Sequence, residues 1–190
     1  MLERLSAKEK EARLKLFRSE CKFIAGAATK TALPQTQLPE IAFIGKSNVG
    51  KSSLINALLN RKALARVSHT PGRTKQINFF DLAGKLLLVD LPGYGYAKVS
   101  HKEQKQWEKL ILHYLDESKN LKLVGVLIDS RRAIKEHDRM ILDLLTQYDI
   151  AFQVILTKSD KISKQELQSV LEESARIVDS YRCNKGSIIA

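Results

Sequence analysis

The stretch Gly45-Lys-Ser-Asn-Val-Gly-Lys-Ser52 decides the fold of this 190-residue chain. It matches the pattern G-x-x-x-x-G-K-[ST], in which a glycine-rich loop surrounds phosphate oxygens with backbone N–H groups. The glycines permit the tight path of such a loop, and Lys51 brings a positive charge to the β- and γ-phosphates. The hydroxyl of Ser52 is then placed to ligate Mg²⁺. The stretch therefore predicts a phosphate-binding site.

The residues on either side of this loop have the pattern that the motif requires. Residues 41–44 form a short apolar run that predicts a strand, and residues 53–60 are apolar at helical spacing. A strand, a glycine-rich loop and a helix in this order place the loop at the N-terminus of a helix, which favours anions. An ordinary strand-to-helix turn is the alternative interpretation.

Composition limits the classes to which the chain can belong. Its length, 44% hydrophobic content and 28% charged content are typical of one soluble globular domain. No apolar run approaches the roughly 20 residues of a membrane span, and the N-terminus lacks a signal-peptide core. Cys21 and Cys183 lie far apart without metal-binding spacing, which is typical of a reducing compartment. We expect a cytoplasmic protein.

The net charge of +11 predicts a polyanionic partner, most simply a nucleic acid. A generally basic background composition is the alternative explanation. The charge gives no information about the fold.

Periodicity along the chain predicts alternating strands and helices. We expect a helix in 2–20, a strand or entry segment at 21–28, and a loop at 30–40. Residues 61–75 hold five Lys or Arg and no acid, and a long irregular segment of this kind is usually functional. Strands at 76–82 and 85–90 are close enough in sequence to pair antiparallel. Helices are expected at 100–117, 134–148 and 163–181, and strands at 121–128, 151–156 and 187–190.

This order predicts an α/β domain with a mainly parallel sheet, one antiparallel strand and helices on both faces. Ligands of such folds bind at the carboxyl ends of the strands. Three motifs are expected at that edge: the phosphate loop and the two described next.

The second motif is Asp90-Leu91-Pro92-Gly93, directly after a predicted strand. Asp90 suits a second magnesium-holding role through a water molecule, and the N–H of Gly93 can meet the γ-phosphate. A simple strand-end turn is the alternative.

The third motif is Thr157-Lys158-Ser159-Asp160, which resembles the [NT]-K-x-D guanine motif. The carboxylate of Asp160 can accept two hydrogen bonds from guanine, whereas adenine lacks such a pair of donors. The stem of Lys158 can lie across the base. Thr157 replaces the commoner asparagine, and we expect it to hold the phosphate loop more weakly. A capped turn is the alternative.

Thr74, in the stretch Thr70-Pro-Gly-Arg-Thr74, is our choice for the threonine that completes magnesium coordination in the triphosphate state. Thr70 is the competing candidate.

Together these motifs resemble translational-type and Ras-like GTPases. More closely, they resemble the EngB family of bacterial GTP-binding proteins, among the TrmE-Era-EngA-EngB-Septin-like P-loop GTPases. The likeness includes Asp90-Leu-Pro-Gly-Tyr-Gly-Tyr-Ala97 and Asp129-Ser-Arg-Arg132. It implies a Ras-like GTPase domain over residues 23–190, a helical extension over 1–22, and a monomer. The family continues past Ala190 with a guanine-contacting loop and a final helix, so the resemblance implies a domain cut short here.

The resemblance implies GTP hydrolysis, a role in large ribosomal subunit assembly, and a requirement in cell division and septation. It implies Lys51, Thr74 and Gly93 as catalytic residues, and Ser52, Thr74 and Asp90 as magnesium ligands. The predicted nucleotide-binding residues are Gly45, Lys46, Ser47, Asn48, Val49, Gly50, Lys51, Ser52, Ser53, Gly72, Arg73, Thr74, Lys75, Gln76, Asp90, Leu91, Pro92, Gly93, Thr157, Lys158, Ser159 and Asp160.

Tyr94 stands where Ras-like proteins carry a water-orienting glutamine. A tyrosine cannot orient water as an amide does, which predicts slow hydrolysis unless a partner or a monovalent cation helps. Asn48 is either a K⁺ ligand or an amide that braces the loop.

Two other functions compete with that of a GTPase. The first is an RNA-binding module that is controlled by the bound nucleotide and has negligible hydrolysis of its own. The second is an ATPase, which Asp160 disfavours.

Overall fold

The computed structural model describes residues 6–61, 76–94 and 101–190. Its strands are β1 (Cys21–Ala27), β2 (Glu40–Gly45), β3 (Ile77–Leu82), β4 (Leu86–Asp90), β5 (Leu121–Asp129) and β6 (Phe152–Thr157). Its helices are α1 (Ala7–Phe17), α2 (Lys51–Leu58), α3 (His101–Glu117), α4 (Glu136–Gln147) and α5 (Lys164–Val178). Short 3₁₀ turns occupy Lys30–Ala32 and Ser159–Lys161.

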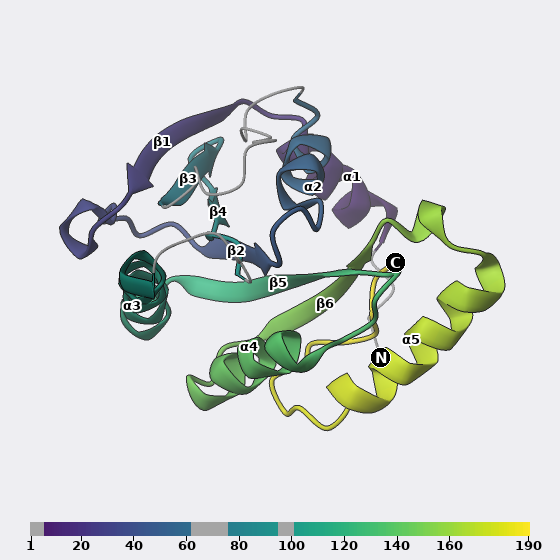
Figure 1. The fold of residues 1–190 in the computed structure, drawn as a ribbon. Coiled ribbons are helices and arrows are strands. Elements are labelled where there is room, and N and C mark those ends of the chain that lie inside the picture. The colour runs from purple at the N-terminus through teal and green to yellow at the C-terminus, as the bar shows by residue number, and fades with distance from the viewer. Residues whose placement is uncertain (1–5, 62–75, 95–100) are drawn as a thin grey trace.

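The strands form one sheet in the order β1-β3-β4-β2-β5-β6 (Figure 1). Strand β3 pairs antiparallel with both β1 and β4, and the β2–β4, β2–β5 and β5–β6 pairs are parallel. Five strands thus share one direction and β3 opposes them, which confirms the predicted sheet. The chain leaves β2 toward β3 and β4 on one side and later reaches β5 on the other. This makes the carboxyl end of β2 a topological switch point, where ligands of α/β sheets bind.

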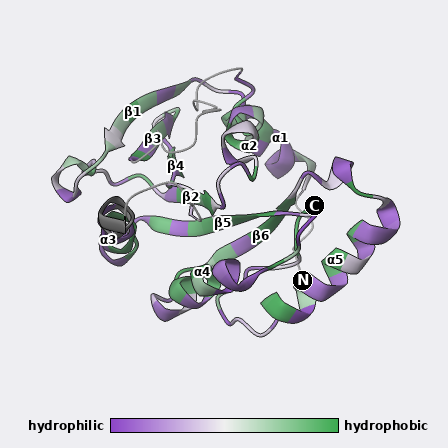
Figure 2. Ribbon diagram, viewed as in Figure 1, coloured by the Kyte–Doolittle hydropathy of each residue, from purple (hydrophilic) through white to green (hydrophobic). Residues whose placement is uncertain are grey.

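Two hydrophobic clusters cover the two faces of the sheet. One combines residues of α3, α4 and α5 with strand residues such as Ala42 and Ile44. The other combines α1 and α2 with strand residues such as Phe43 and Leu88. Alternate residues of β2 therefore face opposite layers, as a strand period of two requires. Figure 2 shows the corresponding hydrophobic colour along the central strands and mixed polarity along α5. Helices on both faces are confirmed.

Two predicted elements differ in the structure. The helix expected at 134–148 begins at Glu136, because Ala133 adopts a left-handed φ of 52° and the Asp138 carboxylate accepts the Lys135 N–H at 2.8 Å. The prediction of a strand at 187–190 was wrong. Only Ile189 forms a parallel bridge there, with Ile155, while the Ser187 carbonyl accepts the side-chain amide of Gln153 instead of continuing a ladder.

Within the described residues, no helix combines the length and apolar character that crossing a bilayer requires.

Candidate functional site

The phosphate loop joins the end of β2 to the start of α2. Gly50 is the N-cap of α2 with φ 106°, a conformation that glycine adopts without strain, and no side chain caps this helix. A Cβ on Gly45 would lie 2.8 Å from the Leu127 carbonyl oxygen, so only glycine fits there. The first N–H groups of a helix have no partner within it. At α2 they are available to an anion such as a phosphate.

The loop after β4 forms backbone hydrogen bonds with the phosphate loop. Tyr94 N–H donates to the Gly45 carbonyl at 3.3 Å, and Ser47 N–H donates to the Tyr94 carbonyl at 3.2 Å. A Cβ on Gly93 would lie 3.2 Å from both the Gly45 carbonyl oxygen and the Ser47 hydroxyl oxygen. The close approach of the two loops therefore depends on Gly93. It brings the first two predicted motifs together.

Lys51 and Asp90 form an ion pair across these two loops. Both side chains are largely buried, at 11% and 5% exposure. Ser52 follows Lys51 in the first turn of α2, next to the residue that pairs with Asp90. Oxygen donors of this kind are the ligands that Mg²⁺ prefers, and a buried acid beside a loop lysine fits that ion. Residues Ser52 and Asp90 could hold it here.

Thr157, at the end of β6, connects the third motif to the phosphate loop. Its hydroxyl lies 2.6 Å from the Val49 carbonyl oxygen and 3.2 Å from that of Ile128. The adjacent Lys158 has a left-handed φ of 59°, and its ammonium donates to the Asn48 carbonyl at 2.6 Å. The threonine thus has a direct, short bond to the loop, although its strength relative to an asparagine stays a prediction.

Asp160 lies apart from these contacts. Its side chain is 69% exposed and pairs with Lys161 at 2.9 Å, and this neighbouring ammonium lowers the pKa of the Asp160 carboxyl. The carboxylate is therefore charged and open to solvent, as an acceptor for an incoming base would need to be. Ser159, beside it, is half-buried.

The remaining predicted residues divide into two groups. Gln76 lies just before β3, and its amide donates to Asn78, which pairs in register with Asp90. Gln76 is thus at the same edge of the sheet as Asp90. The predicted site residues Gly72, Arg73, Thr74 and Lys75, and the competing Thr70, lie outside the described residues.

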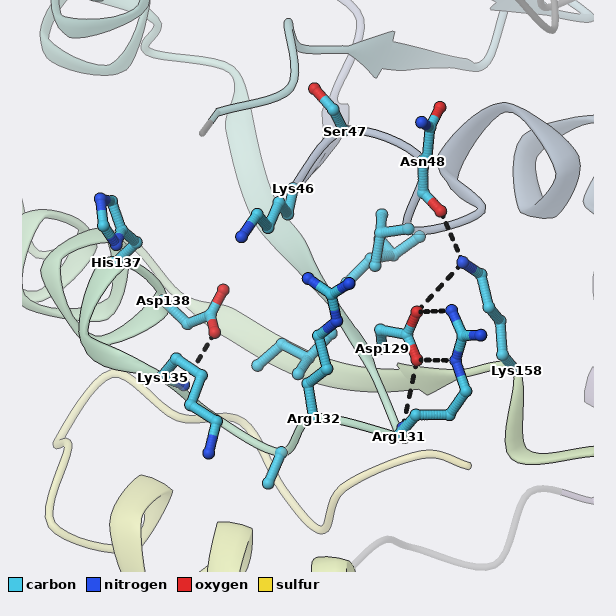
Figure 3. Close-up of a pocket in the computed structure, with 14 residues that line it drawn as sticks. Lys46, Ser47, Asn48, Asp129, Arg131, Arg132, Lys135, His137, Asp138 and Lys158 are labelled. Atoms are coloured by element: carbon cyan, nitrogen blue, oxygen red, sulfur yellow. Dashed lines mark hydrogen bonds and ion pairs between the residues drawn. The ribbon is translucent and has the colours of Figure 1, made fainter. Parts of the chain in front are cut away.

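Behind the phosphate loop lies a cavity of about 210 Å³ that the sequence did not predict (Figure 3). Asp129 lines it and is held by three cationic contacts: Arg131 Nε at 2.9 Å, Arg131 Nη2 at 2.7 Å and Lys158 Nζ at 3.0 Å. The Arg131 hydrogen bonds, and then Lys158, keep the pKa of Asp129 far below its usual range. Lys158 therefore joins the phosphate loop to the end of β5.

Asp138, which also lines this cavity, forms a buried pair with Tyr94. The Tyr94 hydroxyl donates to one Asp138 oxygen at 2.5 Å, and the Lys135 N–H donates to the other at 2.8 Å. Burial, and then the Asp138 charge, raise the pKa of Tyr94 far above its usual range. The residue in the place of the catalytic glutamine thus points to the start of α4. Sequence reasoning missed Asp138, for which the only local signal is an acid three residues after a helix N-cap.

Comparison with known proteins agrees with this geometry. Residues 40–158 match the family model described as 50S ribosome-binding GTPase. A protein of Rickettsia bellii (strain OSU 85-389) named "Probable GTP-binding protein EngB" is 55% identical over 170 residues, covering 90% of this chain and 80% of that protein. A protein of Rickettsia akari (strain Hartford) with the same name is 61% identical over 148 residues, covering 78% of this chain and 70% of that protein.

Solved structures show the same fold. A crystal structure of a probable GTP-binding protein engB aligns with a TM-score of 0.61 and 27% identity, over 74% of this chain and 80% of that one. An Era variant from Aquifex aeolicus, bound to GDP and AlF4⁻, aligns with a TM-score of 0.62 and 21% identity, over 81% and 50%.

The six-stranded sheet, with a phosphate loop at its switch point and two further motifs bonded to that loop, defines a P-loop GTPase domain. Within that class the identities above are specific. The chain belongs to the EngB family of GTP-binding proteins.

Proposed function

We propose that this protein hydrolyses GTP to GDP as a switch in large ribosomal subunit assembly, and that normal cell division and septation require it. One observation carries the proposal: three motifs far apart in sequence lie within hydrogen-bond distance at one edge of the sheet. Membership of the EngB family supports the GTP-binding part, and the matched description as a 50S ribosome-binding GTPase supports the ribosomal part.

In this proposal the residues 45–53 hold the phosphates, chiefly through backbone N–H groups at the start of α2. Lys51 turns from Asp90 toward the β- and γ-phosphates, and the N–H of Gly93 meets the γ-phosphate. Asp160 accepts the guanine donors while Lys158 lies along the base. Residues 72–76 complete the triphosphate side, with Thr74 as the switch threonine.

Magnesium, when bound by Ser52, Asp90 and Thr74, would neutralise phosphate charge during the reaction. The rest of the stabilisation of the transition-state charge comes from residues of this protein. Lys51 and the loop N–H groups face the oxygens on which charge develops while a water attacks the γ-phosphate in line. Acceleration of turnover by K⁺ that Asn48→Ala removes would assign Asn48 as a ligand of that ion, whereas a purely bracing amide predicts no such dependence on Asn48.

We propose that intrinsic turnover is slow. The Tyr94 hydroxyl is engaged with Asp138, so it does not orient an attacking water. The same observation favours a second candidate function, an RNA-binding module that the bound nucleotide controls without measurable hydrolysis. Phosphate release from GTP, measured with and without large ribosomal subunits, separates the two.

We further propose a cytoplasmic monomer whose GTPase domain spans residues 23–190 and whose residues 1–22 form an extension. Two buried free thiols, Cys21 and Cys183, support a reducing compartment. Gel filtration with light scattering would test the monomer.

The deciding experiment is a titration of fluorescent GDP and GTP in Mg²⁺, with ATP as competitor. We expect guanine-selective binding that Asp160→Asn abolishes, because the amide would present a donor to the guanine donors. Asp179→Asn, at the exposed C-cap of α5, is the matched control and should bind as the wild type does. Equal affinity for ATP and GTP, or selectivity that survives in Asp160→Asn, would overturn the assignment of the base site.

A further inference from the structure

The cavity behind the phosphate loop has a strong excess of positive charge. Five cationic side chains and two carboxylates line it, a net charge of +3 with His137 neutral. The cations come from three places in the fold: the phosphate loop, the segment between β5 and α4, and the end of β6. The lining charged residues are Lys46, Asp129, Arg131, Arg132, Lys135, Asp138 and Lys158.

The two carboxylates are already engaged by other groups. Arg131 and Lys158 use both oxygens of Asp129, so these two cations have an ion-pair partner and this carboxylate is fully occupied. The oxygens of Asp138 accept the Tyr94 hydroxyl and a backbone N–H. Neither acid forms an ion pair with a further cation of the cavity.

Three cations of the cavity therefore have no carboxylate in direct contact. Within the part of the chain that the structure describes, no carboxylate pairs with Lys46, Arg132 or Lys135. Figure 3 shows Lys46 descending from the phosphate loop and the Arg132 guanidinium rising from the opposite wall toward it. Two like charges directed into one small space repel each other, which an anion between them would relieve.

The size of the cavity limits that anion. About 210 Å³ is less than the ~300–1,000 Å³ of typical small-molecule sites, so it suits a compact group better than a whole nucleotide. A phosphate group fits this description, and the planar guanidinium of Arg132 offers paired donors to two of its oxygens.

We propose that this cavity binds a backbone phosphate of an RNA strand, with Arg132 as its principal ligand and Lys46 as the opposing cation. The inference rests on the RNA partner in the proposed function, and it deepens that function by naming the contact site. An RNA is favoured because it presents repeated phosphates to a chain of net charge +11. Lys46, Ser47, Asn48 and Val49 of the phosphate loop line the site, so RNA and nucleotide would be held by the same segment.

The test measures binding of a fluorescent single-stranded RNA of about 20 nucleotides to the full chain loaded with GDP or a GTP analogue. We expect Arg132→Gln to weaken binding roughly tenfold at about 0.1 M salt, because a charge-assisted bond to phosphate is lost. The slope of log affinity against log salt should fall by about 0.7, the value for one contact to a single strand. Arg132→Lys should keep most of that slope, since it keeps the charge.

Arg139→Gln is the matched control, because it removes an exposed arginine of α4, the helix that follows Arg132, and Arg139 does not line the cavity. Equal losses in Arg139→Gln and Arg132→Gln would overturn the proposal, as would a wild type that binds GTP but no RNA. Binding of poly-glutamate in preference to RNA would replace the RNA by an acidic protein partner and also overturn it. Fluorescent GTP affinity is measured on every variant. A wild type that fails to bind GTP would count against the proposed function and not against this site.

Discussion

At the scale of single residues, Thr157 links the base-binding and phosphate-binding parts of the site. Its hydroxyl reaches the Val49 carbonyl at 2.6 Å, and nothing in Val or Ala could replace that bond. We expect Thr157→Val to lower the stability by about 1 kcal/mol and to weaken GTP binding several-fold, because the half-buried carbonyl loses its donor. Fluorescent GTP titration and urea unfolding measure the two effects. Thr157→Ser retains the hydroxyl and should restore both, and failure to do so would mean that the methyl group matters more.

Asp129 makes stability depend on pH. The arginine and lysine beside it depress its pKa when the chain is folded, relative to about 3.9 when unfolded. A depressed carboxyl pKa contributes stability above the unfolded value, and this contribution is lost as the pH falls below about 4. The difference in free energy of unfolding between the wild type and Asp129→Asn should thus be largest near neutral pH and shrink in acid. Arg131→Gln should reproduce that trend, whereas a difference that does not vary with pH would contradict it.

At the scale of elements, the loop after β4 is joined to the start of α4 by one buried bond. Removing the Tyr94 hydroxyl in Tyr94→Phe leaves an Asp138 oxygen buried without its donor, which should cost about 1–3 kcal/mol of stability. Asp138→Asn should cost less in a Tyr94→Phe background than alone, because the pair acts as a unit. Chemical denaturation of the two single variants and the double variant gives the coupling energy. If the losses of stability in the two single variants add up to the loss in the double variant, the hydrogen bond between Tyr94 and Asp138 contributes no coupling energy.

The elements also show what the sequence could reveal. The mainly parallel sheet with one antiparallel strand, and the meeting of the three motifs, follow from local periodicity and from motifs with known places on strand ends. The Tyr94–Asp138 and Asp129–Arg131–Lys158 contacts do not, because pairing between Tyr94 and a residue 44 positions later leaves no local pattern. The segment at 187–190 shows the opposite case, in which a local pattern predicts an element that the structure does not form. Its apolar Ile188 and Ile189 read as a strand, but only Ile189 bridges to β6.

At the scale of the whole molecule, the two ends of the sheet have different roles. The carboxyl end carries the phosphate loop and its partners. The opposite end carries a buried carboxylate, Glu40, which accepts the Tyr114 hydroxyl at 2.6 Å and the Ser118 hydroxyl at 3.0 Å. Burial, and then the Glu40 charge, raise the pKa of Tyr114 well above its usual range. This cluster joins the start of β2 to the end of α3, far along the strand from the loop.

The separation of the two ends gives a prediction for the molecule as a whole. Tyr114→Phe should lower the free energy of unfolding by about 1–3 kcal/mol, because Glu40 loses its closest donor while staying buried. GTP affinity should stay unchanged under conditions where the variant is folded, since no residue of this cluster lines the cavity or the phosphate loop. Thr157→Val should differ from it, because that variant also weakens GTP binding several-fold. Urea unfolding and fluorescent GTP titration on both variants test this division. A loss of GTP affinity in folded Tyr114→Phe would mean that β2 transmits changes along its length to the phosphate loop.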